Sequence, residues 1–187
     1  MRKIHALRWT TPGSVLLALA LNGCSAVSQP ASDARMEAID AVRGALELPD
    51  LPLAFVNQTG MVNAPEPGLP VAMYSDNEGR KYYVAVESNT VVEIDGRALL
   101  SGHSPARSGV TAADLRARAD RMARAAFPQG AFLLPLLAYE EGQKGNNYFF
   151  TWRDDSAPVS FNRPFMQLAF VGDGQLFAYY NTLSPKR

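Results

Sequence analysis

Cysteine and histidine are almost absent from this chain, which has one cysteine, Cys24, and two histidines, His5 and His103. A single cysteine allows no disulfide within the chain, so core packing alone must stabilise the fold in an oxidising compartment. A zinc site needs three or four His, Cys or carboxylate ligands. We therefore expect no metal and no cofactor.

Few residues are arranged for catalysis. Ser101 and Ser104 flank His103, but a catalytic triad needs a histidine held by its partners, and these three are neighbours in one loop. Two carboxylate pairs, Glu140–Glu141 and Asp154–Asp155, fall at the ends of expected strands, where charges are normally solvated. Adjacent strand residues also point to opposite faces. We predict no catalytic residue and consider a small hydrolase the least favoured function.

The segment Asp76-Asn77-Glu78-Gly79 is loosely similar to a calcium loop. It lacks the alternating ligand spacing and the closing glutamate of an EF-hand. Asp, Asn and Gly are typical turn residues. The segment therefore predicts a turn between two strands.

The chain has no excess of basic residues, since 18 Lys and Arg balance 18 Asp and Glu. Arg2, Lys3 and Arg8 all precede Cys24, so the chain after Cys24 is mildly acidic. A nucleic-acid-binding protein needs a basic surface. Nucleic acid is therefore not expected as a partner.

Long hydrophobic runs are also missing. The longest run near the start, Val15–Leu21, is far shorter than the roughly 20 apolar residues needed to span a bilayer. It follows the basic residues Arg2, Lys3 and Arg8 and precedes Gly23, which is small. This order predicts a secretory signal peptide over residues 1–23.

The segment Leu21-Asn22-Gly23-Cys24 resembles the lipobox of bacterial lipoproteins, with Asn22 where a small or branched residue is usual. The resemblance implies cleavage before Cys24 and a diacylglycerol on its sulfur. Two or three acyl chains anchor a protein stably in a membrane. Ser25, in place of aspartate, implies the outer membrane facing the periplasm. The alternative is an ordinary signal peptide followed by an unmodified cysteine. Residues 24–32 are small and polar and predict a tether.

Two amphipathic helices are predicted after the tether. Thr111 and Asp114 have the spacing of a capping box at the start of a helix over Thr111–Phe127. Its apolar stripe is formed by Leu115, Ala119, Met122 and Ala126. A second helix is expected over Asp33–Leu46, with Met36, Ile39, Val42 and Leu46 on its buried face.

The remaining signals are those of β-strands separated by turns. Pro135 predicts that the segment 132–140 forms an edge or bulged strand. Loops are expected over 57–68 and 96–109 and a turn over 142–146. The expected strands cover 51–56, 71–75, 81–87, 90–95, 132–140, 147–153, 165–171 and 175–183. The pattern predicts an α+β fold in which a helix packs on an antiparallel sheet.

The two parts of the chain after the tether are similar, since each has a helix, a broken segment and strands that end in a hairpin. We therefore expect two αβββ units with a period of about 80 residues, over 33–100 and 111–187. The helix 112–127, the strand Tyr148–Trp152 and the hairpin 165–180 around Gly172-Asp173-Gly174 resemble PepSY-type domains. The first unit resembles them only loosely. This resemblance implies a binding module, and inhibition or restraint of peptidases is the activity proposed for that family.

Aromatic residues follow the expected strands and supply either core or a recognition surface. We predict that Phe150, Trp152, Phe170 and Phe177 lie in the core. Tyr83, Tyr148 and Tyr180 are the candidate binding residues. The helix over Thr111–Phe127 carries Arg116, Arg118, Arg121 and Arg124. They form either a solvated face, with the i,i+4 ion pairs Asp114–Arg118 and Asp120–Arg124, or a contact for anionic lipid.

These observations favour an envelope-anchored lipoprotein that binds a protein or peptide partner without catalysis, including restraint of a peptidase. The alternative is a structural lipoprotein that contacts peptidoglycan or outer-membrane lipid.

Overall fold

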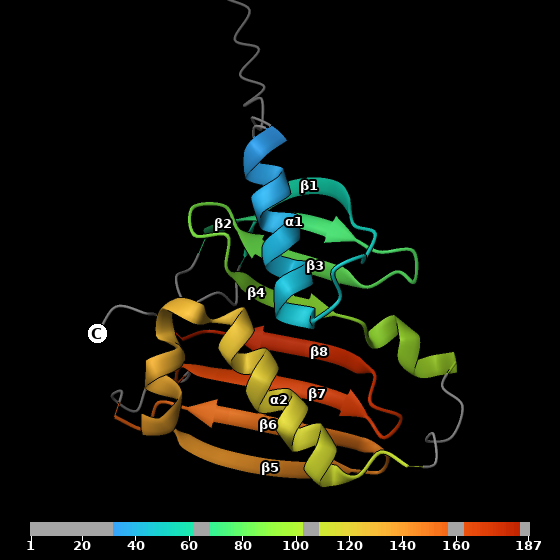
Figure 1. Ribbon diagram of the computed structural model, residues 1–187. Coiled ribbons are helices and arrows are strands. Elements are labelled where there is room, and N and C mark those ends of the chain that lie inside the picture. Colours follow the sequence, from blue (N-terminus) through green and yellow to red (C-terminus); the bar gives the residue numbers. More distant parts are fainter. Residues whose placement is uncertain (1–31, 62–67, 103–108, 157–162, 184–187) are drawn as a thin grey trace, which may run out of the picture.

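The computed structural model describes residues 32–61, 68–102, 109–156 and 163–183. Within these residues an eight-stranded antiparallel sheet carries its two long helices on one face (Figure 1). The fold class predicted from the sequence is therefore confirmed as α+β. The expected signal peptide, Cys24, most of the tether and His103 lie outside the described residues.

Each long helix is followed by an antiparallel meander of four strands, which agrees with the eight strands expected from the sequence but exceeds the three strands of the expected αβββ unit. The sheet has the order β1-β2-β3-β4-β8-β7-β6-β5, so that β4 and β8 join the N-terminal half-sheet, β1–β4, to the C-terminal half-sheet, β5–β8. The elements are α1 (Ser32–Leu46), β1 (Ala54–Met61), β2 (Leu69–Ser75), β3 (Lys81–Ala85), β4 (Val91–Asp95), the 3₁₀ helix η1 (Arg97–Gly102), α2 (Ala112–Ala126), the 3₁₀ helix η2 (Pro128–Leu136), β5 (Ala138–Lys144), β6 (Asn147–Arg153), β7 (Phe165–Val171) and β8 (Leu176–Asn181).

Helix α2 has the predicted capping box. The Thr111 hydroxyl accepts a hydrogen bond from the Asp114 backbone N–H at 3.2 Å, and the Asp114 carboxylate accepts one from the Thr111 N–H at 2.9 Å. These contacts satisfy two N–H groups that a helix start leaves without partners. The predicted stripe of Leu115, Ala119, Met122 and Ala126 is buried against the sheet.

Helix α1 differs in part from its prediction. Val42 and Leu46 are buried as expected, but the Met36 side chain is 53% exposed. Ala38 and Ala45 are buried instead. Together with Val42 they form a buried stripe at positions i, i+4 and i+7 of the helix. The small side chains on this stripe suit a helix that lies between β3, β4 and α2.

The prediction of a strand over 132–140 is wrong for most of that segment. Residues Pro128–Leu136 form η2, and β5 begins only at Ala138. The apolar run has no alternation of polar and apolar residues, and Leu133 and Leu134 are both buried although they are adjacent. Pro128 has no N–H, which suits the first turn of a helix. Pro135, on which the strand prediction rested, lies inside η2.

Several element boundaries also differ from the predictions. β1 continues through Met61 into the expected loop over 57–68, and η1 occupies part of the expected loop over 96–109. β5 and β6 pair as far as Lys144 and Asn147, so the expected turn over 142–146 is reduced to Gly145-Asn146. The strands β3 and β8 are shorter than expected.

One hydrophobic core lies between the sheet and the two helices, and it contains residues of α1, α2, η2 and both half-sheets. The predicted core residues Phe150, Trp152 and Phe170 belong to it. Phe177 is also buried, but it lies on the opposite face of the sheet from Tyr179. A register shift between Ala169 and Phe170 of β7 places an extra residue in β8. Such a bulge reverses the alternation of side chains, which the sequence pattern did not reveal.

Candidate functional site

The three candidate tyrosines lie on two different faces of the sheet. Tyr83 packs with Val71, Ala85 and Val92, and Tyr180 packs with a cluster around Ala169, both on the face that α1 and α2 leave open. Tyr148 packs against the core beneath the helices. The structure therefore brings Tyr83 and Tyr180 together and separates Tyr148 from them.

Strand register places Tyr83 and Tyr180 in one row. Tyr83 pairs with Glu93 across β3 and β4, and Glu93 pairs with Tyr180 across β4 and β8. Side chains of directly paired residues on one face lie about 5 Å apart at their Cβ atoms. Glu93 is therefore flanked on both sides by tyrosine, at the point where the two half-sheets join.

Asp95 and Arg97 complete this group, which we name the seam patch: Tyr83, Glu93, Asp95, Arg97 and Tyr180. The Arg97 guanidinium donates two hydrogen bonds to the Asp95 carboxylate, from Nε at 2.8 Å and from an Nη at 2.7 Å. This pairing lowers the pKa of Asp95. A bidentate guanidinium–carboxylate pair is well defined in geometry, so Arg97 is committed to Asp95.

Glu93 has a different electrostatic environment. Partial burial and the nearby charge of Asp95 raise the pKa of its carboxyl group. Among the described residues, no donor reaches the Glu93 carboxylate and no cation forms an ion pair with it. Burial and the negative charge of Glu93 also raise the pKa of Tyr83 and of Tyr180.

Local sequence explains how β4 and β8 come close enough to form the patch. The Gly96 N–H donates a hydrogen bond to the Phe177 carbonyl oxygen at 2.8 Å. A Cβ at position 96 would lie 3.1 Å from that oxygen, tighter than ordinary contact. Glycine therefore allows the end of β4 to pair closely with β8.

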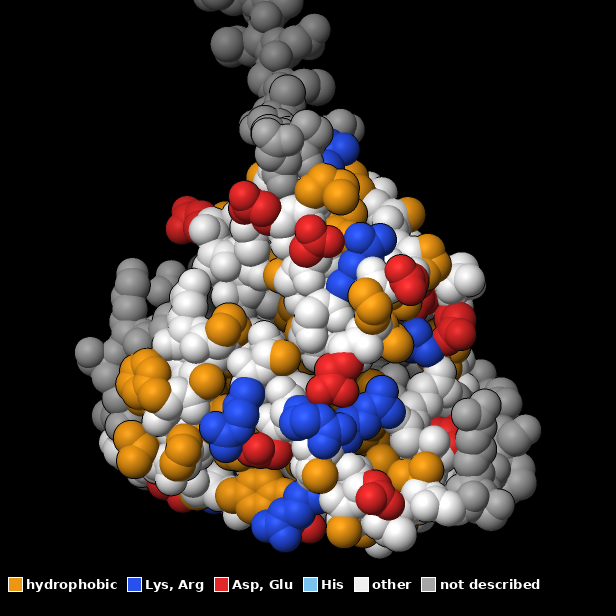
Figure 2. Space-filling view, in the orientation of Figure 1, with side chains coloured by type: hydrophobic (Ala, Val, Ile, Leu, Met, Phe, Trp, Pro, Cys, Tyr) orange, Lys and Arg blue, Asp and Glu red, His pale blue; other side chains and the backbone are white. Residues whose placement is uncertain are grey.

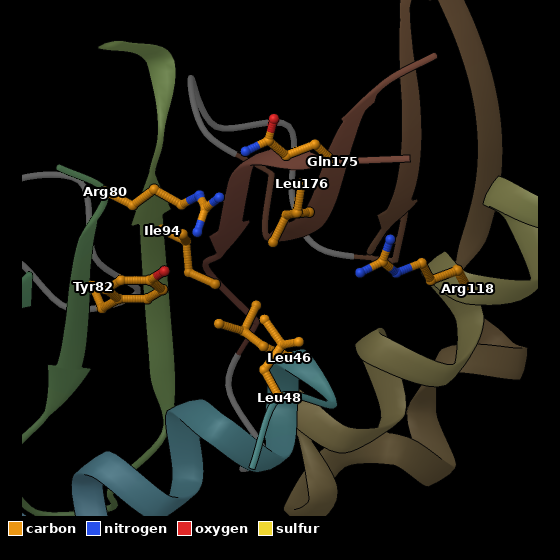
Figure 3. A pocket seen from close by; sticks show the side chains of 8 residues that line it. All are labelled: Leu46, Leu48, Arg80, Tyr82, Ile94, Arg118, Gln175 and Leu176. Atoms are coloured by element: carbon orange, nitrogen blue, oxygen red, sulfur yellow. The ribbon is translucent and has the colours of Figure 1, made fainter. Parts of the chain in front are cut away.

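A pocket of about 160 Å³ lies on the other face, between the ends of α1 and α2 and the β4–β8 pair. Figure 3 shows Arg80 and Arg118 approaching it from opposite sides, with Leu46, Leu48 and Leu176 between them.

Both arginines of this pocket already have acceptors within the protein. Arg80 pairs with Asp76 at 2.8 Å and with Glu78, and Arg118 donates to the Gly174 carbonyl oxygen. The charge of Arg80 is thus matched by two carboxylates. The pocket is a weaker candidate for ligand binding than the seam patch.

Asp76 forms a turn, as predicted. Its carboxylate, with 0% of the side chain exposed, accepts from the backbone N–H groups of Glu78 and Arg80 at 2.9 and 3.0 Å. The Tyr82 hydroxyl donates to it at 2.6 Å, and burial raises the pKa of that hydroxyl. No cluster of potential metal ligands is found within the described residues.

The predicted carboxylate pairs are held apart. Glu140 pairs with Arg153 at 3.0 Å, whereas Glu141 pairs with Arg116 of α2 at 3.0 Å on the helix side. Asp155 pairs with Arg153 and Arg163. Glu140, Glu141 and Asp155 are thus each paired with an arginine, and Asp154 accepts hydrogen bonds from Ser156. Glu140 and Asp155 share Arg153, whereas the adjacent Glu140 and Glu141 bind different arginines.

Helix α2 carries Arg116, Arg118, Arg121 and Arg124. Blue side chains lie over the position of α2 in the lower half of Figure 2, with red acidic side chains among them. Asp120 and Arg124 form the expected i,i+4 pair at 3.0 Å. The expected pair of Asp114 and Arg118 does not form, because Asp114 caps the helix and Arg118 reaches Gly174. Arg121 pairs with Glu47 at the end of α1. These contacts favour the solvated face over a contact for anionic lipid.

Sequence reasoning identified Tyr83 and Tyr180 but missed Glu93. Glu93 interrupts the otherwise apolar run Val91-Val92-Glu93-Ile94, and a charge in such a run was the available signal. Its importance depends on the pairing of β4 with β8, strands separated by more than 80 residues of chain.

No helix of the described residues is long and apolar enough to cross a membrane. No protein-family model matches the chain, and neither a curated protein nor a solved structure shows significant similarity to it.

Proposed function

We propose that the protein is an envelope lipoprotein, anchored through Cys24 and facing the periplasm, which binds a protein or peptide partner and catalyses no reaction. The single observation that carries the binding proposal is the row of Tyr83, Glu93 and Tyr180 on the face of the sheet opposite α1 and α2. Tyrosine and arginine are enriched where proteins bind proteins. The anchor rests on the lipobox-like segment Leu21–Cys24.

We further propose that the chain is a degenerate tandem of two helix-plus-meander units related to PepSY-type domains. Two register shifts support this. One lies where Val84 of β3 pairs with Val91, so that Val92 is the extra residue of β4. The other lies where Phe170 of β7 pairs with Leu176, so that Phe177 is the extra residue of β8. In each meander, the extra residue is thus the second residue of the last strand.

A tandem of this kind would act as a scaffold in which the last strands of the two units, β4 and β8, lie side by side. The partner would contact the seam patch, to which both units contribute. Restraint of a peptidase follows if the partner is an enzyme whose active site is covered by this contact. The alternative, a structural lipoprotein, would contact peptidoglycan or lipid through the same surface.

Site-specific photo-crosslinking in cells tests the binding proposal. A benzophenone side chain at position 180 is expected to give one defined protein adduct, whose partner mass spectrometry identifies. The matched control is the same group at position 148, on the opposite face, which should give none. Adducts with only lipid or peptidoglycan would support the alternative, and the absence of any adduct at position 180 would refute both.

The lipid anchor is tested separately. Metabolic labelling with an alkyne fatty acid should mark the wild-type protein and leave the Cys24→Ala variant unlabelled. A wild-type protein that is released from the cell without label would contradict the anchor, while the binding proposal would stand.

A further inference from the structure

Among the described residues, the half-buried carboxylate of Glu93 stands without an ion-pair partner. Charged groups taken out of water are normally paired, because unpaired burial costs free energy. Asp95 forms an ion pair with Arg97, Glu140 forms one with Arg153, and Asp76 forms one with Arg80. Glu93 has no such partner among the described residues.

Arg97 does not compensate the negative charge of Glu93. Arg97 lowers the pKa of Glu93 only as the last and weakest of its influences, while Asp95 acts in the opposite direction. Arg97 also holds Asp95 through both of its hydrogen bonds. Lys81, which lies opposite Asp95 across β3 and β4, also lowers the pKa of Asp95. Both cations of this region therefore act mainly on Asp95, and Glu93 keeps no ion pair among the described residues.

The groups on either side of Glu93 suit a cation. Tyr83 and Tyr180 are its direct cross-strand neighbours and are each partly exposed. The face of a tyrosine ring attracts an ammonium or guanidinium group within about 6 Å. A carboxylate between two such rings offers a cation both a hydrogen-bond acceptor and an aromatic contact.

We infer that the seam patch receives a basic side chain, lysine or arginine, of the bound partner, with its charge at Glu93 and its aliphatic stem between Tyr83 and Tyr180. This inference rests on the proposed function and names the chemistry of the partner. It commits to a cationic residue of a polypeptide, because the Glu93 carboxylate is the charge of the patch that has no ion pair among the described residues. A free phosphate or an anionic lipid headgroup would be repelled.

The inference can be tested without knowing the partner. The probe is Nα-acetyl-lysine methylamide, which keeps the charged side-chain amine. Its matched control is Nα-acetyl-norleucine methylamide, which has a similar aliphatic stem without the charge. The full-length protein is labelled with fluorotyrosine, and the Tyr83 and Tyr180 signals are assigned with the Tyr83→Phe and Tyr180→Phe variants. Titration should shift both signals saturably with the lysine probe only.

Two variants determine which group recognises the probe. Glu93→Gln keeps the size of the side chain and should weaken binding of the lysine probe at least about tenfold, since a charged acceptor is lost. Tyr180→Leu should weaken it about two- to fivefold through loss of the ring contact. Glu140→Gln is the control, because Glu140 lies on the same open face at the edge of the sheet and is paired with Arg153.

The outcomes separate this inference from the proposed function. Equal shifts with the lysine and norleucine probes, or unchanged affinity in Glu93→Gln, would overturn the inference even if the crosslinking experiment yields a protein adduct. A shift specific to lysine and lost in Glu93→Gln would support it. If crosslinking then yields no adduct, the failure belongs to the proposed partner in the envelope, since the cation site itself would have been measured.

Discussion

The two half-sheets share an architecture but bury different chemistry beneath their helices. In the N-terminal half-sheet the largest buried side chains are Tyr74 and Tyr82, and the buried carboxylate of Asp76 receives the Tyr82 hydroxyl. In the C-terminal half-sheet they are Tyr179, Phe150 and Phe170, with Trp152 beside them. One half depends on hydrogen bonds in its interior, and the other depends mainly on hydrocarbon packing.

The edge strands continue this contrast. β1 carries no charged residue over Ala54–Met61, whereas β5 has Glu140, Glu141 and Lys144. Charged side chains protect an edge strand against pairing with other chains. The order of helix and meander alone therefore does not determine which forces stabilise a unit. Variants in each half-sheet and at their junction test this difference.

The largest effect is expected in the C-terminal half-sheet. Trp152 is buried, and its ring centroid lies 5.2 Å from that of Tyr139. Replacing it with alanine removes a large apolar side chain and leaves a cavity, so Trp152→Ala should lower the free energy of unfolding by about 3–5 kcal/mol. Urea titration followed by far-UV circular dichroism measures this change. Phe132→Ala is the control, because Phe132 is 67% exposed and its loss should cost less than about 0.5 kcal/mol.

The same titration tests how independent the two halves are. Residues of both half-sheets share one core, so we expect a single unfolding transition that moves as a whole in Trp152→Ala. Two separate transitions, with only one displaced, would mean that each half folds alone and would make the comparison a contrast between two domains.

The next effect is expected in the N-terminal half-sheet. Asp76→Asn keeps the shape of the side chain but removes the charge that Arg80 pairs with and one acceptor of the network. Loss of hydrogen bonds to a buried charged group should cost about 2–4 kcal/mol. The matched control is Asp95→Asn, which breaks the pair with Arg97, an arginine whose side chain is 60% exposed. Exposed pairs contribute little, so the control should cost less than about 1 kcal/mol. Similar losses in both variants would show that burial of Asp76 does not matter.

The sequence predicted most of the fold because its strongest signals are local. The capping box at Thr111 and Asp114 and the stripe from Leu115 to Ala126 depend on residues within one helix, and both are confirmed. The alternation in β3 and β6 likewise depends on neighbours a few positions away. Such signals require no knowledge of the rest of the molecule.

The predictions failed where contacts between residues far apart in the sequence determine the structure. The bulge at Phe177 and the pairing of Glu93 with Tyr180 depend on how β8 meets β7 and β4. The prediction of an edge or bulged strand around Pro135 is wrong because the 3₁₀ helix η2 has no periodic pattern by which the sequence could reveal it. Tyr148 was grouped with the open-face tyrosines because residue type alone does not reveal the face. The two tyrosines of the candidate site could therefore be predicted from residue type. Glu93 could not, because its place in the site depends on strand register.

The smallest effect is expected at the junction of the two half-sheets and depends on pH. Burial and the charge of Asp95 raise the pKa of Glu93 above its ordinary value of about 4.5. A carboxyl whose pKa is higher in the folded state binds protons more tightly there, so its contribution to stability falls as pH rises from about 4.5 through the folded pKa. Below that range both states are protonated and the penalty is absent. Glu93→Gln should therefore leave stability unchanged at pH 3.5 and raise it at pH 7 by less than about 1 kcal/mol, since Glu93 is partly exposed.

Urea titrations of the wild type and Glu93→Gln at both pH values measure this difference, with Glu140→Gln as the control whose carboxylate is already paired with Arg153. A loss of stability in Glu93→Gln at pH 7 would show that the Glu93 carboxylate is already compensated within the protein and would remove the reason to expect a cation from a partner. A gain confined to pH 7 would mean that the junction holds an uncompensated charge at a cost to its own stability, which a basic residue of a partner would offset on binding.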